Sequence, residues 1–185
     1  FDRVSYKYLT DSLEALGFGP RFQRAVGVMY NADSPPKRRI LANGYYSPWF
    51  DIRSGVAQGC PLSPLLFLIV AEGLKISLDM QREFTGLRIG GTYYKLSQFA
   101  DDTTLVLGDL DQLQHAEEGI LRWCRATGMR ENKSKREGLA MGLYREQHLP
   151  PDIDWKGEGE WATCLGVPIG NDLNADKWWM KKLEE

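Results

Sequence analysis

The chain has 185 residues, which is enough for one packed domain and too few to promise two. Its apolar share of 43% excludes a disordered chain. Because 23 basic residues nearly balance 25 acidic ones, no overall field would gather nucleic acid or coat a membrane, so any nucleic-acid role must be local.

Two helices are predicted at the start of the chain. Apolar residues recur at helix spacing from Val4 to Leu16, and Gly17 is a typical residue after a helix end. Asp2 is placed to cap this helix. A second helix is expected to start near Pro20, since proline suits the first helical turn.

A hairpin and a buried helix follow. Residues 38–53 contain an Asn-Gly pair between apolar segments, which is the strongest short signal for two antiparallel strands. The next stretch, SGVAQGCPLSP, is too rich in Gly and Pro to be regular. Ser63 is then a candidate N-cap with Pro64 at the first helical position, opening an apolar helix to about Leu78.

The second half of the chain predicts another hairpin, a helix and further strands. The hairpin turns at the Gly-Gly pair within residues 86–100. A helix over 109–127 has a start resembling a capping box and ends before Gly128. Strands are plausible at 137–143 and 161–168. The expected capping pair is Asp109 and Gln112. The apolar side of this helix is expected to comprise Leu110, Leu113, Ile120, Leu121 and Cys124.

This order of elements predicts an α+β fold, in which helices pack on an antiparallel sheet. The longest apolar run, residues 65–71, is too short to span a bilayer, so no membrane role is expected. Three widely spaced cysteines suit a reducing, intracellular compartment better than a disulfide framework or a zinc site.

Asp101 and Asp102 stand between two segments that both have strand character. If residues 96–100 and 103–107 pair, the two Asp are the turn itself, where positive φ is costly and two negative charges lie side by side. Mg²⁺ would compensate, because proteins hold it with one or two carboxylates plus substrate phosphates. Two such ions about 4 Å apart would activate a hydroxyl and stabilise a leaving pyrophosphate. The turn alone is equally consistent with an exposed acidic loop.

Gln58 and Gly59 form a second constellation just before the Pro-bounded turn and the buried helix. Without a side chain, Gly59 lets the backbone approach a flat ligand closely, and Gln58 can hydrogen-bond from a fixed stem. The residues themselves leave open the alternative of a structural junction between loop and helix.

Together these residues resemble the reverse transcriptase domain of non-LTR (LINE-type) retrotransposons. QGCPLSPLLF at 58–67 and FADD at 99–102 carry the resemblance. The supporting matches, in chain order, are FDRV, LEALGFGPRF, NGYYSPWFDIRSGVAQGCPLSP, GMRENKSK and CLGVPIG. Each piece is weak alone, but the ordered set is specific.

The resemblance implies a right-handed polymerase palm with part of the fingers over residues 1–170, and a linker or the start of a thumb at 171–185. The implied activity copies RNA into DNA with Mg²⁺, or Mn²⁺ as an alternative. The implied partners are an RNA template, a DNA primer or target, deoxynucleoside triphosphates, and the missing fingers, thumb and endonuclease of a larger polyprotein. A nuclear location is expected from the family.

The resemblance also assigns catalytic roles. Asp101 is the metal-binding carboxylate and Asp102 its partner. Lys135, in NKSK, matches the lysine that similar polymerases are thought to use near the leaving pyrophosphate, where a cation or proton donor would help.

Four residues are assigned to substrates by the same resemblance. Phe99 and Ala100 back the primer terminus, while Gln58 and Gly59 line the pocket for the incoming nucleotide and its template base. The chain also departs from the family pattern: Ala57 stands where Arg is frequent, and Cys164 stands where an aromatic residue is common.

Family members carry a further metal-binding Asp ahead of the position matched by Asp2, so we expect the chain 1–185 to be inactive in isolation. The main rival is a decayed remnant of such an element that acts at most as a nucleic-acid-binding module. Another palm-type enzyme, such as a nucleotide cyclase, is less well supported, because its acidic residues typically lie beside glycines. Bacterial intron-type reverse transcriptases share the Gln-Gly and Asp-Asp pairs, but GCPLSPLLF is closer to the LINE-type pattern.

Overall fold

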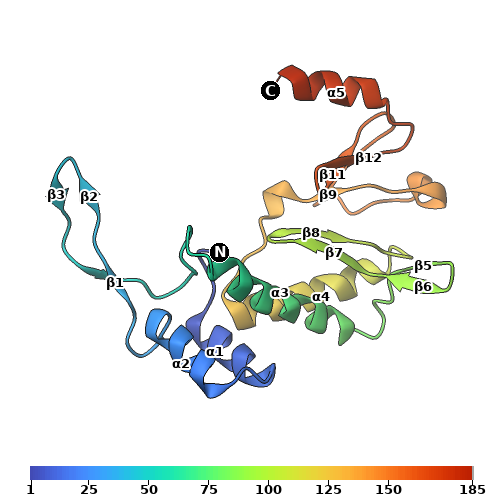
Figure 1. Cartoon of the computed structure of the whole chain (residues 1–185). Coiled ribbons are helices and arrows are strands. Elements are labelled where there is room, and N and C mark those ends of the chain that lie inside the picture. Colours follow the sequence, from blue (N-terminus) through green and yellow to red (C-terminus); the bar gives the residue numbers. More distant parts are fainter. Residues whose placement is uncertain (185) are drawn as a thin grey trace. The chain divides into compact units, whose positions relative to one another are not determined.

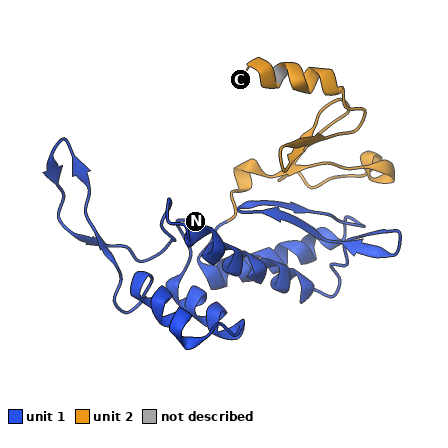
Figure 2. Ribbon diagram, viewed as in Figure 1, with its two compact units in different colours: residues 1–130 blue, residues 131–185 orange. Residues whose placement is uncertain are grey.

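A computed structural model describes residues 1–184 and divides the chain into two compact units, residues 1–130 and 131–185 (Figure 2). Helices and short strands alternate along both units, which confirms the predicted α+β class (Figure 1). Among the described residues, no helix combines the length and the apolar character needed to cross a membrane.

The first unit begins with the two predicted helices, α1 (Tyr6–Ala15) and α2 (Pro20–Met29). Helix α1 ends as expected, with Gly17 at a φ of +77°. Its cap was predicted wrongly: Ser5, not Asp2, is the N-cap, and the Ser5 hydroxyl accepts a hydrogen bond from the Tyr8 amide. Asp2 is too far ahead of the first helical residue to reach these amides, and it has another contact described below.

The core of this unit is the packing of α3 (Ser63–Asp79) against α4 (Gln112–Thr127). A close approach is possible because Gly119 offers no side chain, and the Ser77 hydroxyl donates to the Gly119 carbonyl at 2.8 Å. The indole of Trp123 donates to the Val70 carbonyl at 3.0 Å. Each large apolar side chain buried here contributes about 1.5–3 kcal/mol. The fully buried large apolar side chains on α3 are Leu66, Phe67, Val70 and Leu78.

Both helix starts differ slightly from their predictions. Helix α3 has Leu62 as N-cap, because the buried hydroxyl of Ser63 contacts the Tyr30 hydroxyl instead. Helix α4 starts at Gln112 without a side-chain cap, since the Gln112 side chain is used in a long-range contact. Its buried face also differs: Leu121 is 49% exposed. The buried residues of α4 are Ala116, Gly119, Trp123 and Thr127.

Four strands between α2 and α3 form an arm, defined here as residues 37–51. Leu41–Ala42 (β2) and Tyr45–Tyr46 (β3) pair antiparallel around the predicted Asn-Gly turn, where both residues have positive φ. Lys37–Arg38 (β1) pairs with Phe50–Asp51 (β4). Figure 1 shows the arm leaving the helices after α2 and returning before α3.

The predicted strands after α3 form two hairpins. Leu87–Ile89 (β5) pairs with Thr92–Tyr94 (β6) around the Gly-Gly turn, as predicted. Leu96–Phe99 (β7) pairs with Asp102–Leu105 (β8) and carries the Asp pair at its tip.

The second unit contains short elements. Glu137–Gly138 (β9) pairs in parallel with Asp154–Trp155 (β10). Where strand was expected over 161–168, Ala162–Cys164 (β11) and Val167–Ile169 (β12) pair as an antiparallel hairpin. The strand expected over 137–143 is confirmed only at its first two residues, because the chain turns at Gly142 (φ +59°) into a 3₁₀ helix, Gly142–Glu146. A second 3₁₀ helix is Lys133–Lys135, and α5 is Ala175–Glu184.

Candidate polymerase site

The β7–β8 hairpin has one face toward the helices and one toward solvent. Cross-strand partners share a face, and alternate residues point to opposite sides. Leu96 and its partner Leu105 pack against the core. Asp102 pairs with Phe99, and both side chains are exposed, Phe99 by 71%. Asp102 and Phe99 therefore share the face of the hairpin away from its packed side.

The turn is shifted by one residue from its prediction. Ala100 and Asp101 are the two turn residues, while Asp102 is the first residue of β8. The ladder extends one pair further because Phe99 and Asp102 still pair. Ala100 takes a φ of +51°, which costs an alanine about 1–2 kcal/mol relative to the right-handed region. Strain of this kind persists only where the surrounding structure fixes the backbone, and it clusters at functional sites.

A hollow of about 260 Å³ lies between the packed side of β7 and α3. Its α3 wall is formed by residues one helical turn apart, including Leu68 and Glu72, and its β7 wall includes Gln98 and Ala100. The side-chain amide of Gln98 donates to the backbone carbonyl of Ala100 at 3.4 Å. Ala100, just before the Asp pair, therefore lines this hollow together with the middle of α3.

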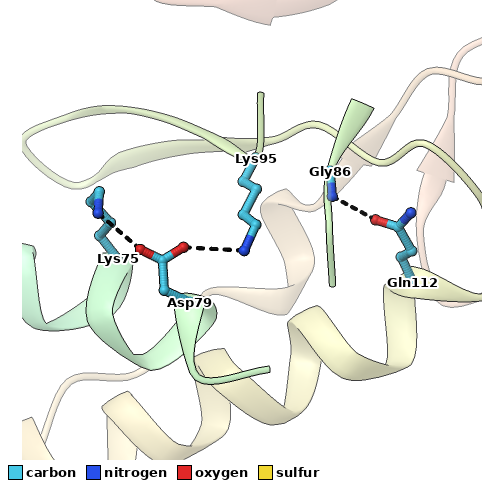
Figure 3. Close-up of polar contacts among 5 residues, drawn as sticks. All are labelled: Lys75, Asp79, Gly86, Lys95 and Gln112. Atoms are coloured by element: carbon cyan, nitrogen blue, oxygen red, sulfur yellow. Dashed lines mark hydrogen bonds and ion pairs between the residues drawn. The ribbon is translucent and has the colours of Figure 1, made fainter. Parts of the chain in front are cut away.

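Lys95, directly before β7, is tied to the end of α3. Asp79 receives Lys75 on one carboxylate oxygen at 2.8 Å and Lys95 on the other at 3.1 Å (Figure 3). These contacts, the hydrogen bond from Lys75 first, hold the pKa of Asp79 below its ordinary value. The Asp79 carboxylate thus links the residue before β7 to the last residue of α3.

Protonation of Asp79 is expected to loosen this attachment. A depressed folded-state pKa contributes stability that is present above the ordinary pKa of Asp and lost as pH falls through the folded value. The side chain is 45% exposed, so screening keeps the effect below about 1 kcal/mol. In Asp79→Asn we expect faster amide hydrogen exchange at residues 95–97. Asp11→Asn, which breaks the comparable Lys7–Asp11 pair on α1, should leave those amides unchanged.

A second attachment joins the start of the β5–β6 hairpin to α4. The Gln112 side chain accepts from the Gly86 amide at 2.8 Å (Figure 3). It also donates to the Thr85 hydroxyl at 3.1 Å. Gly86 has a φ of +78°, and a Cβ there would lie 2.3 Å from the Tyr94 carbonyl oxygen. A glycine is therefore required where the chain enters this hairpin.

The loop with Gln58 and Gly59 is held by the first residues of the chain. The Val56 amide donates to the Phe1 carbonyl at 3.0 Å, and the Gln58 amide side chain donates to the Asp2 carboxylate at 3.3 Å. Asp2 was predicted only as a helix cap, so this contact was not expected. Its position beside Phe1 in FDRV was the available signal, but the partner lies 56 residues away.

Tyr30 fixes both ends of the same loop. Its buried hydroxyl accepts from the Ala57 amide at 3.1 Å and contacts the Ser63 hydroxyl at 3.3 Å. Gln58 and Gly59 are exposed between these points, and Gly59 has a φ of +83°. Next to them, a hydrogen bond from the Leu62 amide lowers the pKa of the Cys60 thiol.

Helix α3 is the element common to both groups of predicted site residues. The Gln58–Gly59 loop leads into its first turn, and Ala100 lines the hollow with Leu68 of the same helix. Neither Gln58 nor Gly59 lines that hollow. Lys135 belongs to the second unit, at the end of an exposed 3₁₀ helix, and its assigned role stays a prediction.

The hairpin tip offers the donor type that Mg²⁺ prefers, because both predicted ligands are carboxylates. Asp101 and Asp102 are exposed, and neither carboxylate forms an ion pair within the described part of the chain. Over residues 1–184, no group of three or more His, Cys, Asp or Glu side chains is placed to enclose a metal ion. An ion held by these two carboxylates would therefore need substrate oxygens or water to complete its ligands.

The chain is similar to known proteins over most of its length. A family profile described as "Reverse transcriptase (RNA-dependent DNA polymerase)" matches residues 1–170. The chain is 34% identical over 172 residues to the "Transposon TX1 uncharacterized 149 kDa protein" of Xenopus laevis, covering 90% of this chain and 13% of that protein.

A second relative is similar over a shorter stretch. It is the "Retrovirus-related Pol polyprotein from type-2 retrotransposable element R2DM" of Drosophila melanogaster, 29% identical over 135 residues. That alignment covers 73% of this chain and 12% of the relative. The chain thus spans only a small part of the length of the proteins it matches.

Proposed function

The chain belongs to the reverse transcriptase family, and we propose that it forms part of the palm and fingers of a domain that copies RNA into DNA during non-LTR retrotransposition. The family implies dependence on a divalent metal. One observation supports the proposal most strongly: FADD occupies the tip of a two-stranded hairpin, with Asp102 and Phe99 together on its solvent-facing side.

Asp101 and Asp102 would hold the metal, for which we propose Mg²⁺; such an ion activates an attacking hydroxyl and stabilises a leaving pyrophosphate. The positive φ of Ala100 reverses the chain directly before these carboxylates. A turn of two residues leaves little freedom at the tip, so both side chains start from a fixed backbone.

The remaining assigned residues would position substrates. Phe99 is exposed beside Asp102 and offers an aromatic surface to the primer terminus. Gln58 has an exposed side chain in a loop fixed by Tyr30 at either end, and Gly59 leaves its backbone accessible to a nucleotide. We further propose that RNA template, DNA primer and deoxynucleoside triphosphates are the substrates of the larger protein.

The proposal predicts metal binding at the hairpin tip. When Mn²⁺ is added to the ¹⁵N-labelled chain, we expect paramagnetic broadening to be strongest at residues 99–103. Asp102→Asn should weaken this binding by at least about tenfold, because loss of even a supporting group at a metal site costs 10–100-fold. Asp33→Asn, which removes one exposed carboxylate from a loop, is the matched control and should have no effect.

The same titration separates the enzyme from its rival. A deoxynucleoside triphosphate should tighten the metal, since its phosphates complete the ligand set. Broadening spread over many carboxylates and unchanged by Asp102→Asn would overturn the proposed site and leave a non-catalytic module. With only two carboxylates at the tip, we expect weak binding and little primer extension by residues 1–185 in isolation.

A further inference from the structure

The arm, residues 37–51, exposes an unusual number of large apolar and aromatic side chains. Its strands contain no buried residue, and Ser47 is the only one of its positions that is even half-buried. Soluble proteins rarely leave contiguous apolar surface of this kind without a partner. The most exposed large side chains are Ile40 at 60%, Leu41 at 58%, Tyr45 at 82%, Tyr46 at 57% and Trp49 at 61%.

On one face of the arm, an arginine lies over two aromatic rings. The guanidinium carbon of Arg39 lies 3.6 Å from the centre of the Tyr46 ring and 4.8 Å from that of Trp49. Arg39 forms no ion pair with any carboxylate in residues 1–184. A stacked guanidinium keeps its N–H groups at the rim of the stack, where they can donate to a phosphate.

Tyr45 presents a separate ring. Because neighbouring strand residues point to opposite faces, Tyr45 lies on the face away from Tyr46. Both faces are held by the backbone: the Ser47 amide donates to the Ile40 carbonyl at 2.8 Å, and the Ile40 amide donates to the Ser47 hydroxyl at 2.9 Å. The rings therefore project from a paired ladder.

The charge of the arm is positive although the whole chain is slightly acidic. Residues 37–51 contain Lys37, Arg38 and Arg39 against one acid, Asp51, which is a net charge of +2 counted from the sequence. Asp51 is itself paired with Arg53 at 3.2 Å. A cationic surface with exposed rings is complementary to a phosphate backbone whose bases are free to stack.

We propose that the Arg39–Tyr46–Trp49 face of the arm is a docking surface for single-stranded nucleic acid. The rings stack on unpaired bases, and the cations contact the adjoining phosphates. This surface lies outside the Asp pair and requires no metal. It rests on the proposed function only for the choice of RNA as the first probe.

Binding is tested with a fluorescein-labelled 15-nucleotide RNA, added without metal or nucleotide and followed by fluorescence anisotropy. Tyr46→Ala and Trp49→Ala should each weaken binding about 5- to 100-fold, the range that loss of one stacked base produces. Arg39→Ala should weaken binding and lower the slope of log K against log salt by about 0.7, as expected for one phosphate contact on a single strand.

Arg88→Ala and Tyr93→Ala are the matched controls. They alter another exposed Arg–Tyr pair, 5.9 Å apart, on the β5–β6 hairpin of the same unit, and should leave affinity within about twofold. Equal losses in both hairpins would mean unspecific charge binding and would overturn the inference. So would unlabelled duplex competing as well as single strand, or no RNA binding at all, which would point to a polypeptide partner.

The outcome is independent of the metal titration. Loss of tip-localised Mn²⁺ broadening with arm-dependent RNA binding would reject the polymerase proposal and keep the docking surface. The reverse pattern would reject the docking surface alone. Because the substituted side chains are exposed, their variants should keep the amide spectrum of the core.

Discussion

Gly55→Ala is expected to destabilise the first unit by about 2–5 kcal/mol. Gly55 has a φ of +87°, and a Cβ there would lie 2.7–2.8 Å from the backbone of Asp2. An alanine pays about 1–2 kcal/mol for the left-handed backbone, and a forced backbone shift adds about 1–3 kcal/mol. The Gly55 amide also donates to the Val4 carbonyl at 2.8 Å, so this contact would be strained as well.

Gly44→Ala is the matched control for this effect. Gly44 has nearly the same backbone, with a φ of +82°, but a Cβ added there would have no other atom within 4 Å. Urea unfolding followed at the core amides of residues 1–130 should therefore give at most the conformational cost for Gly44→Ala, about 1–2 kcal/mol. Equal losses in the two variants would show that the contact with Asp2 is not limiting.

The same substitution should disturb the candidate site. Asp2 contacts the Gln58 side chain, so displacement of the Asp2 backbone removes one support of the loop. We expect shifted amide signals at residues 56–59 in Gly55→Ala and not in Gly44→Ala. The space available at Gly55 would thus affect the position of Gln58, a predicted nucleotide contact.

Local chemistry explains which parts of the fold were predictable. The Asn-Gly and Gly-Gly turns specify their hairpins because glycine accepts positive φ there, as at Gly44 and Gly91. Gly17 and Gly128 end their helices for the same reason. In each case the deciding interaction lies within a few residues along the chain.

Long-range contacts explain the errors. The Gln112 side chain bonds Gly86, 26 residues away, and so does not cap its own helix. Asp2 was predicted as a cap because its partner, Gln58, is remote in sequence. The face of α4 was misplaced toward Leu121 because Gly119 and Trp123 face α3, which apolar spacing alone does not reveal.

The roles of the site residues stay predictions, and the geometry of their turn differs from its prediction by one residue. The order of QGCPLSPLLF and FADD suggests these residues through a family pattern, not through their spacing. The one-residue shift of the turn follows from pairing of Phe99 with Asp102, which depends on how far the ladder extends. The contact of Arg39 with two rings of the arm could not be predicted from the sequence, because Trp49 reaches Arg39 from beyond the end of β3.

Trp123→Ala is expected to cost about 3–5 kcal/mol, because it empties the contact between α3 and α4, the helices beneath the hairpin. Trp123→Phe keeps most of the ring but loses the 3.0 Å hydrogen bond to the Val70 carbonyl, so about 1–2 kcal/mol is expected. Hydrogen exchange of α3 amides in urea would measure both losses of stability.

Trp49→Ala, the same change at a 61% exposed residue, should leave the stability measured by α3 exchange within about 0.5 kcal/mol while weakening RNA binding. If Trp49→Ala also accelerated exchange in α3, the arm would be part of the packed core and not a separate docking surface.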